Sequence, residues 1–459
     1  MRGMRWFCFV LSACSLMWGA DWPPSLDRNS TVSQTLDGRN IERYTHGGRR
    51  DWGYPEESAA EWEYPKARES GKNEQNHNSF YVVAPLHPRK NAPLCVVLHS
   101  ANRTAFDYLG YQFLNRKIDA NDDPASVVTR VPDDCYALYP NTTNDEWWGW
   151  GMVRRDTARY GTALAPPEKR VFDTIEWVVR LYKIDRNRIY LSGVSMGGCG
   201  ALGLGLPHGE IFAAVLADVP AGTEYVAFRR GFPPAATEDS PAARDVWLKQ
   251  ISGSGLPDPP PLLDFSAQND NWSKTQPALL QAALAGRLPL VLGWGPFGHT
   301  TFTNAIAKYP QCEVALAYPW FEIRKDAAYA VFTSSTSDQR CPWLDTTAGF
   351  DESGQMNAYF RWKGRQDDSS KFAIQLWIAH PTIQGAPSKM PDFATADVTF
   401  RRLQRFRIRP GKSYDWRIFR GGKQIASGKI TPDAANLLTV PKLTLTTIPA
   451  ELSIRAEKE

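Results

Sequence analysis

Beyond residue 20, the sequence lacks any apolar run of the roughly 18–20 residues that a transmembrane helix requires. It also lacks an excess of one charge, because 53 Lys and Arg are set against 49 Asp and Glu and the net charge is only +4. Such a balance gives no electrostatic reason to expect a nucleic-acid partner. No Cys or His cluster has the spacing of metal ligands, and no internal repeat is present. We therefore expect no membrane span, no nucleic-acid partner and no bound metal.

What the sequence does have is length and tryptophan. A chain of 459 residues is long enough for two or three domains. With 42% hydrophobic and 22% charged residues, its composition is typical of a globular protein. The 17 Trp exceed what a generic core needs, so some of them are expected on the surface as platforms for sugar rings or aromatic groups.

The first twenty residues have the pattern of a secretory signal. Arginines in Met1–Arg5 precede a short apolar run, Trp6–Trp18, which is followed by small residues up to Ala20. We expect cleavage after Ala20 and a secreted or periplasmic protein. The alternative is a lipid anchor at Cys14, because Leu11-Ser12-Ala13-Cys14 resembles the cleavage box of a bacterial lipoprotein. The apolar residues just after Cys14 favour simple cleavage.

Five cysteines remain once those of the leader are removed, and an odd number cannot all pair. Cys95 and Cys135 lie within apolar, strand-like runs, where a buried free thiol is the simpler interpretation. Export would permit disulfides, and Cys312 with Cys341 is the pair to test.

After the leader, the spacing of apolar residues divides the chain into three parts. Residues 21–78 are polar and show no sustained period, which predicts an irregular arm. Residues 79–320 alternate short apolar runs with helical periods, which predicts an α/β domain whose mostly parallel sheet is covered on both faces. Residues 321–459 show alternating strands and the turn Arg420-Gly421-Gly422-Lys423, which predict an all-β sandwich of the immunoglobulin or fibronectin type. In the α/β part we expect strands at Phe80–Val83, Leu94–Leu98, Cys135–Pro140, Arg188–Ser192, Ile211–Ala217, Leu262–Ser266 and Leu288–Leu292, and helices at Pro166–Ile184 and Gln276–Ala285.

The strongest chemical signal is Gly193-Val194-Ser195-Met196-Gly197-Gly198. It follows the strand expected at Arg188–Ser192 and precedes a helix rich in Gly and Ala. Glycines on both sides allow the strained turn that lifts a serine Oγ to the edge of a sheet, which is the context of a nucleophile elbow. Ser195 is therefore the predicted nucleophile.

A serine nucleophile requires a base, and the sequence has only seven histidines. In a doubly wound hydrolase the base comes last in chain order, after the nucleophile and the acid. His208 is too close behind Ser195, and His380 lies in the predicted sandwich. We therefore assign the base to His299, just past the strand expected at Leu288–Leu292.

The acid is expected after the preceding strand. Asp270 lies there, free to reach a histidine ring and fix its tautomer. Asp218, at the end of the strand before, is a serious alternative because that strand also ends at the carboxyl edge of the sheet. Asp264 lies inside a strand and is interpreted as a hydrogen-bonded structural group.

Backbone N–H groups are expected to bind the oxyanion of the reaction. One is that of Met196, the residue after the nucleophile. The second should come from the loop after Val96-Val97-Leu98, where Ser100 or Ala101 can supply it. This loop lacks the glycines of the His-Gly-Gly stretch found in many esterases, so the choice between the two stays open.

Together, Leu98-His99, the elbow around Ser195, Asp270 and Gly298-His299 resemble the secreted α/β-hydrolase esterases that include feruloyl esterases, acetylxylan esterases and polyhydroxybutyrate depolymerases. The resemblance covers roughly residues 80–310. It implies hydrolysis of carboxylic esters without a cofactor, on an ester-bearing polysaccharide or polyester. The arm and the sandwich lie outside it.

The substrate pocket is expected to be lined by aromatic side chains. Glu146-Trp147-Trp148-Gly149-Trp150-Gly151 lies between a strand and the long helix, in a loop at the carboxyl edge where substrates bind in such folds. An alternative is that this loop packs its indoles into the domain. We interpret six aromatic side chains as lining one cleft: Trp147, Trp148, Trp150, Trp272, Trp294 and Phe297.

Two other functions stay open on the sequence. A serine peptidase of the prolyl-oligopeptidase type shares the fold and the order of the triad, but the arm of residues 21–78 is too short for its large N-terminal domain. The other is a carbohydrate-adhesion protein whose hydrolase domain is inert. The retained Ser195, Asp270 and His299 argue against it.

Overall fold

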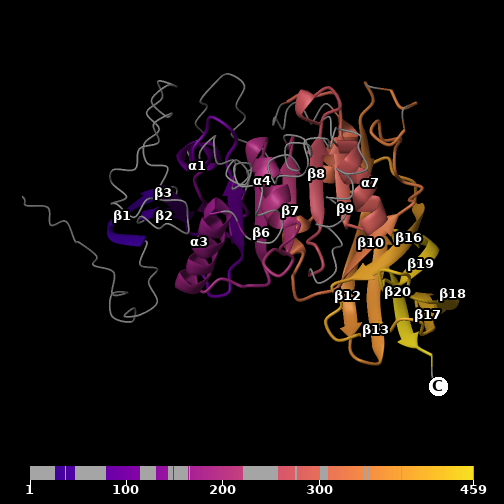
Figure 1. Cartoon of the computed structure of the whole chain (residues 1–459). Coiled ribbons are helices and arrows are strands. Elements are labelled where there is room, and N and C mark those ends of the chain that lie inside the picture. Colours follow the sequence, from indigo (N-terminus) through magenta and orange to yellow (C-terminus); the bar gives the residue numbers. More distant parts are fainter. Residues whose placement is uncertain are drawn as a thin grey trace, which may run out of the picture.

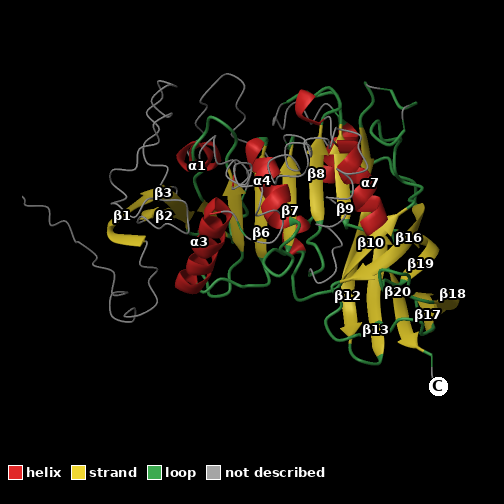
Figure 2. Ribbon diagram, viewed as in Figure 1, coloured by secondary structure: helices red, strands yellow, loops and turns green. Residues whose placement is uncertain are grey.

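The structure is a computed structural model, which shows an α/β domain joined to a group of antiparallel sheets (Figures 1 and 2). It describes the chain in segments, and for the first of them the backbone alone. These segments are residues 26–36, 38–46, 79–113, 131–142, 148, 164, 166–220, 257–273, 276–299, 309–345, 347–349, 351–383 and 385–457.

Ten of the described strands form one sheet at the centre of the α/β domain, in the order β1-β2-β3-β5-β4-β6-β7-β8-β9-β11. Neighbours from β5 to β9 in this order run parallel, and β1, β2, β3 and β11 add antiparallel edges. The strands β4 to β9 are short and buried along their whole length, as strands covered on both faces must be. Their bounds are β1 Leu26–Leu36, β2 Arg39–His46, β3 Ser79–Val83, β4 Leu94–Leu98, β5 Tyr136–Tyr139, β6 Ile189–Val194, β7 Ala214–Asp218, β8 Leu262–Ser266, β9 Leu290–Trp294 and β11 Gly354–Met356.

Helices pack on both faces of this sheet. Because side chains alternate along a strand, β4 sends Val96 and Leu98 into one core and Cys95 and Val97 into the other. The first core contains α3 (Pro166–Tyr182), α4 (Met196–Gly205) and α7 (Gln276–Gly286), and the second contains α1 (Ala105–Phe113) and α9 (Pro310–Leu316). The predicted doubly wound arrangement is confirmed, and the domain has the α/β-hydrolase fold.

The C-terminal part is built from two larger antiparallel sheets, β10-β16-β19 and β12-β13-β20-β17-β18. Phe332 stacks on Phe360 with ring centroids 4.2 Å apart, and the rings of Phe372 and Phe400 are 5.2 Å apart, so the two sheets share a core. The bounds are β10 Tyr329–Thr333, β12 Phe360–Asp367, β13 Lys371–Ile378, β14 Thr382–Ile383, β15 Ala386–Pro387, β16 Phe393–Arg401, β17 Tyr414–Arg420, β18 Lys423–Ile430, β19 Thr439–Thr446 and β20 Ala450–Ala456, with 3₁₀ turns at Asn271–Ser273 and Trp320–Glu322.

The sequence predicts an irregular arm over residues 21–78, but part of this arm has regular structure. Its residues 26–36 and 39–46 form β1 and β2, and β2 pairs with β3 of the ten-stranded sheet. Tyr44 anchors this hairpin, since its ring stacks on Phe80 at 5.3 Å and meets Trp177 of α3 edge-on at 4.8 Å. The strands carry mostly polar residues, so their alternation is too weak to detect in the sequence. Residues 47–78 lie outside the described residues.

The structure also differs from the prediction at the boundary between the two domains, which the sequence places near residue 320. Gly354–Met356 lies within the range predicted for the sandwich, yet it forms β11 and pairs antiparallel with β9 of the ten-stranded sheet. The side chain of Asn357 continues this connection by donating to the backbone oxygens of Leu290 and Phe332 at 2.9 and 3.1 Å. One segment of the C-terminal part therefore completes the sheet of the α/β domain.

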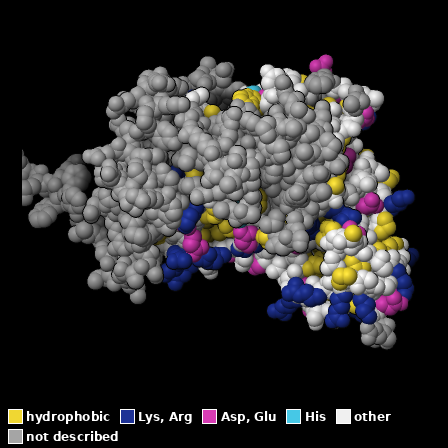
Figure 3. Space-filling model, in the orientation of Figure 1, with side chains coloured by type: hydrophobic (Ala, Val, Ile, Leu, Met, Phe, Trp, Pro, Cys, Tyr) yellow, Lys and Arg dark blue, Asp and Glu magenta, His cyan; other side chains and the backbone are white. Residues whose placement is uncertain are grey.

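Charge is distributed unevenly between the two parts. Residues 357–457 contain 17 Lys and Arg against eight Asp and Glu, although the whole chain carries only +4. Figure 3 shows Lys and Arg side chains gathered over the end of the sandwich farthest from the α/β domain. The sandwich is thus the basic part of the molecule.

The cysteines do not form the pair that the sequence suggests for testing. Cys312 and Cys341 are both free and buried, and they belong to the cores on opposite faces of the sheet. Cys312 Sγ instead donates to the backbone oxygen of Trp294 at 2.7 Å. Cys95 and Cys135 are buried free thiols, as predicted.

Within the segments that the structure describes, no helix combines the length and the apolar character needed to cross a membrane.

Candidate active site

Ser195 lies at a sharp turn between the end of β6 and the start of α4. Its backbone has φ 56° and ψ −115°, a conformation that costs a side-chain-bearing residue free energy. Two backbone hydrogen bonds hold this turn. The Ser195 N–H donates to the backbone oxygen of Asp218 at 2.8 Å, and the Ser195 carbonyl accepts from the Cys199 N–H at 2.9 Å. The predicted elbow is therefore present, with Ser195 at its strained apex.

The glycines of the elbow are required by close backbone contacts. A Cβ on Gly193 would lie 2.2 Å from the Gly197 oxygen, and a Cβ on Gly197 would lie 2.1 Å from the Leu98 oxygen. No side chain fits at either position. The second contact also places the elbow directly against the end of β4, where the loop of Ser100 and Ala101 begins.

His299 bridges Ser195 and Asp270. Its Nε2 lies 2.8 Å from Ser195 Oγ, and its Nδ1 lies 2.7 Å from Asp270 Oδ2. The Asp270 side chain is only 1% exposed, whereas that of His299 is 35% exposed. The second oxygen of Asp270 accepts the Trp272 N–H at 2.9 Å. Because the carboxylate can only accept, Nδ1 carries the proton and Nε2 is left to accept from the serine hydroxyl.

The two other aspartates proposed near this edge have different surroundings. Asp218 is fully buried, and neither of its carboxyl oxygens has a hydrogen-bond partner among the described residues. Burial, with Asp264 and Asp270 nearby, raises the pKa of Asp218 well above its usual value. The N–H of Val219 is directed elsewhere, to the Phe265 oxygen at 2.7 Å. It is thus Asp270, and not Asp218, that the structure joins to His299.

Asp264 has the structural environment that the sequence predicts. Its oxygens accept from Ser266 Oγ at 2.7 Å and from Gln276 Nε2 at 2.6 Å, inside the core. Burial raises its pKa to about 6.

Asn269 is a site residue that the sequence analysis missed. Its Oδ1 accepts the N–H of Gly298 at 2.7 Å, and its Nδ2 donates to the Pro296 oxygen at 3.1 Å. These bonds tie the loop before His299 to the loop that carries Asp270. Its position next to Asp270 in the chain was the one available signal.

The loop after β4 is fixed by a buried histidine. His99 Nε2 accepts the N–H of Thr142 at 3.1 Å, so its Nδ1 carries the proton and donates to the Ser100 oxygen at 2.9 Å. Because a trans peptide places its C=O and N–H on opposite sides, the Ala101 N–H points away from the His99 ring. The side chain of His99 thereby sets the direction of one of the two amides considered for the oxyanion.

Trp148 does not form a wall of the cleft, contrary to the prediction. It is fully buried, with its Nε1 donating to the His99 oxygen at 3.2 Å and its ring 4.9 Å from that of His99. The alternative, in which the loop packs an indole into the domain, is correct for this residue. Trp147 and Trp150 lie outside the described residues.

Trp294 is also misassigned as a cleft residue. It is fully buried in β9, and β11 covers it so closely that a Cβ on Gly354 would lie 2.0 Å from its indole. Phe297 is nearly buried and packs against Tyr309 at 6.1 Å between ring centroids. Of the predicted aromatic residues that the structure describes, Trp272 lies beside the site, since its ring is 6.3 Å from that of His299 and it is partly exposed.

The amide of Met196 opens α4. The first N–H groups of a helix have no acceptor within it, and the helix dipole places partial positive charge at that end. The side chain of Met196 is buried in the core. Among the described residues, no group of three or more His, Cys, Asp or Glu could hold a metal ion.

Comparison with known proteins finds no matching family model and no matching curated protein. Among solved structures, the chain is similar to an S-formylglutathione hydrolase from Agrobacterium tumefaciens (15% identity, 59% of this chain and 92% of that one, TM-score 0.37). It is also similar to an acetyl xylan esterase from Aspergillus awamori (15%, 45% and 74%, TM-score 0.34) and to a ferulic acid esterase (14%, 49% and 85%, TM-score 0.30). At these identities and TM-scores, the activities of those proteins are not transferred to this chain. The roles proposed below therefore rest on the geometry of this chain.

Proposed function

We propose that this protein is an exported serine hydrolase that cleaves carboxylic esters through a Ser195-His299-Asp270 triad. The observation that carries the proposal is the hydrogen-bonded chain from Ser195 Oγ through His299 to Asp270, with distances of 2.8 and 2.7 Å. Its members come from three separate loops, and the serine occupies a strained turn at the start of a helix. This is the geometry by which a hydroxyl is activated as a nucleophile.

In the first half of the reaction, Ser195 Oγ attacks the ester carbonyl carbon as its proton passes to His299 Nε2. The imidazolium is stabilised by Asp270, which accepts from Nδ1 throughout. The negative charge on the carbonyl oxygen is bound by the N–H of Met196 and by that of Ser100 or Ala101. Collapse of the tetrahedral intermediate breaks the bond to the alcohol, which takes the proton from Nε2 and leaves.

In the second half, water attacks the acyl-serine. His299 removes a proton from the water as its oxygen bonds to the acyl carbon, and then returns that proton to Ser195 Oγ as the acid is released. His299 makes every proton transfer, between Ser195, the leaving alcohol and the attacking water, so the proposed mechanism uses neither a metal nor a cofactor.

For the substrate we propose feruloyl or acetyl esters of plant cell-wall polysaccharide. Support comes from the leader-like first twenty residues and the high tryptophan content. The partly exposed indole of Trp272 beside His299 adds an aromatic surface next to the nucleophile. A polyester of the polyhydroxybutyrate type would present the same ester group without the sugar or the aryl ring.

The test is an activity panel of p-nitrophenyl acetate, methyl ferulate, acetylated xylan, polyhydroxybutyrate and a prolyl peptide, with Ser195→Ala as the control. We expect hydrolysis of the small esters and of at least one polysaccharide ester, all lost in Ser195→Ala. If the variant retained more than about a tenth of wild-type turnover, Ser195 would not be the nucleophile, since loss of a triad nucleophile costs many powers of ten. Cleavage of the peptide alone would replace the esterase by a peptidase.

A further inference from the structure

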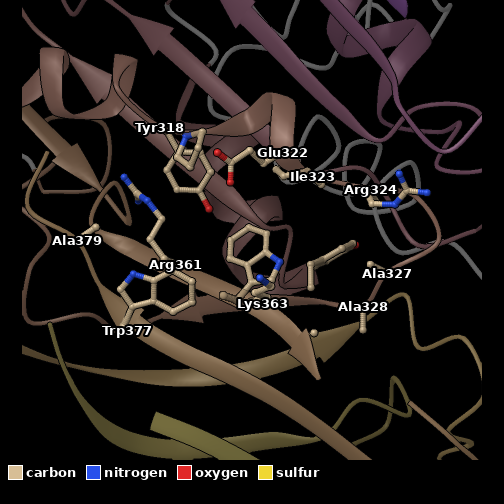
Figure 4. A pocket seen from close by; sticks show the side chains of 14 residues that line it. Tyr318, Glu322, Ile323, Arg324, Ala327, Ala328, Arg361, Lys363, Trp377 and Ala379 are labelled. Atoms are coloured by element: carbon tan, nitrogen blue, oxygen red, sulfur yellow. The ribbon is translucent and has the colours of Figure 1, made fainter. Parts of the chain in front are cut away.

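A second cavity lies where the catalytic domain meets the sandwich. It has a volume of about 510 Å³, within the range of small-molecule sites. One side is formed by the segment 318–329 that follows α9, and the other by β12 and β13. Figure 4 shows Tyr318 and Glu322 from the first side facing Arg361, Lys363 and Trp377 from the second.

This cavity is separate from the triad. The Tyr190 hydroxyl, at the start of β6, donates to the oxygens of Phe321 and Ile323, and the Lys325 N–H donates to the Asn187 oxygen just before β6. Segment 318–329 therefore lies at the amino edge of the sheet, whereas Ser195 follows the last residue of β6. The six residues of β6 span about 20 Å, so the cavity cannot hold the bond that Ser195 would attack.

The cavity is lined by aromatic surfaces whose polar atoms are unused. Tyr318, Trp362 and Trp377 all line it. Among the described residues, none of the Tyr318 hydroxyl, the Trp362 Nε1 and the Trp377 Nε1 has a hydrogen-bond partner. Flat apolar faces beside free hydrogen-bonding groups suit a ligand that is apolar on its faces and polar around its rim.

Arg361 and Glu322 add charged groups of both signs. The Arg361 guanidinium is held over the Tyr318 ring at 4.5 Å, and its Nη1 donates to the oxygens of Ala358 and Phe360 at 2.7 and 2.8 Å. The side chain is buried, yet its Nε and Nη2 have no acceptor among the described residues. Glu322 faces the same cavity without an ion pair to Arg361 or to any other described group. Arg361 Nε and Nη2 can therefore donate to a ligand in the cavity, and the two carboxylate oxygens of Glu322 can accept from the same ligand.

We propose that this cavity is a binding site for a neutral sugar ring of a polysaccharide. A ring hydroxyl both donates and accepts, so neighbouring hydroxyls can accept from Arg361 and donate to Glu322, which a simple anion or cation cannot do. The indoles of Trp362 and Trp377 supply the faces on which the ring packs. The site would hold a polymer chain at a distance from the catalytic serine.

An acidic sugar is the alternative ligand of the same size. The sandwich is basic, and Lys363 lies two residues from Arg361 on the same strand, so a carboxylate would be attracted to this region. Glu322, which lacks a partner among the described residues, opposes it, because a carboxylate ligand in the cavity would meet a like charge. Neutral and acidic oligosaccharides are therefore the two arms of the test.

The experiment measures binding by isothermal titration calorimetry on the Ser195→Ala protein, so that the result does not depend on hydrolysis or on the proposed function. The probes are xylohexaose and cellohexaose as neutral sugars and the hexamer of galacturonic acid as the acidic one. We expect binding of a neutral hexamer. The further changes Trp377→Ala and Glu322→Gln should each weaken that binding about tenfold, because each removes a ring face or a charge-assisted hydrogen bond.

Trp416→Ala is the matched control, because Trp416 is a partly buried indole of the same sandwich on β17, outside the cavity. It should bind the neutral hexamer as the parent does. Equal binding by the parent, Trp377→Ala and Glu322→Gln would overturn the proposal, as would absence of binding by both neutral hexamers. Exclusive binding of the acidic hexamer, lost in Lys363→Ala, would overturn it in favour of an anionic ligand.

Discussion

The side chain of Asn269 holds the backbone of Gly298, whose N–H donates to Asn269 Oδ1 at 2.7 Å, one residue before His299. The same amide donates to the Pro296 oxygen at 3.1 Å. Asn269 precedes Asp270, so one dipeptide fixes both the loop of the histidine and the carboxylate that accepts from it. The distance from His299 to Asp270 therefore depends on Asn269 without Asn269 touching either reacting atom.

We predict that Asn269→Ala lowers kcat by roughly 10- to 100-fold, because misplacing a catalytic group by about 1 Å is enough for such a loss. KM and the melting temperature should change little, since Asn269 is exposed and holds only a loop. Asn269→Asp retains an acceptor for the Gly298 N–H and should recover part of kcat. The measurement is kcat and KM on p-nitrophenyl acetate. A loss of stability matching the loss of kcat would contradict a positioning role.

The assignment of the acid can be tested with two matched amide substitutions. Asp270→Asn should lower kcat by about 10⁴-fold, because an amide in this position can impose the wrong tautomer on His299. Asp218→Asn should retain kcat within about threefold, since its side chain has no partner among the described residues and does not reach the histidine. Both variants are assayed on the same ester. The reverse pattern would transfer the role of the acid to Asp218.

Asp218 should also make the stability of the protein depend on pH. In the unfolded chain an aspartate titrates near pH 3.9, whereas burial near Asp264 and Asp270 raises the pKa of Asp218 well above that value. Between the two values the folded state binds more protons than the unfolded state, so the contribution of Asp218 to stability falls as pH rises. The slope is at most about 1.4 kcal/mol per pH unit.

Asn at this position cannot ionise, so Asp218→Asn should match the wild type near pH 4 and become progressively more stable than it up to pH 8. The free energy of unfolding by urea at pH 4.5, 6 and 7.5 gives the comparison. A constant difference across these pH values would contradict the prediction. So would a wild type that is the more stable protein at pH 7.5, because that would require a favourable partner for the ionised carboxylate.

Local patterns were sufficient to predict the α/β domain, and they selected three residues whose side chains form one hydrogen-bonded chain in the structure. Buried parallel strands read as continuous apolar runs, and the elbow places Gly residues at fixed positions around Ser195. The structure has the strands and helices at the predicted places and brings Ser195, His299 and Asp270 together. Elimination among seven histidines led to His299, which the structure places against Ser195, because chain order restricts where a base can lie.

Contacts between distant segments could not be read from the sequence. Nothing near Trp148 or Trp294 in the sequence shows that these side chains are buried. Contacts with the distant residues His99 and Gly354 bury them. The edge strands β1, β2 and β11 were missed because each is polar or very short, and because β3 and β9, which join β2 and β11 to the sheet, are remote from them in the chain. The bond of Asn269 to Gly298 spans 29 positions and has no local signature.

Replacing Trp148 should affect the fold and not the choice of substrate. Trp148→Phe keeps a ring against His99 but removes the hydrogen bond to the His99 oxygen, which is worth about 0.5–1.5 kcal/mol. We expect a lower melting temperature and an equal decrease of kcat/KM on p-nitrophenyl acetate and methyl ferulate. Trp272→Ala is the comparison, and it should lower kcat/KM mainly for methyl ferulate. Selective loss of the aryl ester in Trp148→Phe would restore Trp148 as a substrate contact.

The junction of β11 with β9 should be intolerant of even one methyl group. A Cβ on Gly354 would lie 2.0 Å from the Trp294 indole, which is fully buried and has no space to move, so Gly354→Ala must push the two strands apart. We expect a loss of roughly 1–3 kcal/mol in the free energy of unfolding, the usual cost of overpacking. Gly364→Ala is the matched control, because nothing lies within 4 Å of a Cβ there on β12. Thermal unfolding of the two variants decides the matter. If Gly354→Ala had the same melting temperature as Gly364→Ala and the wild type, β11 would not be packed on Trp294. This indole would then again be available as a wall of the substrate cleft.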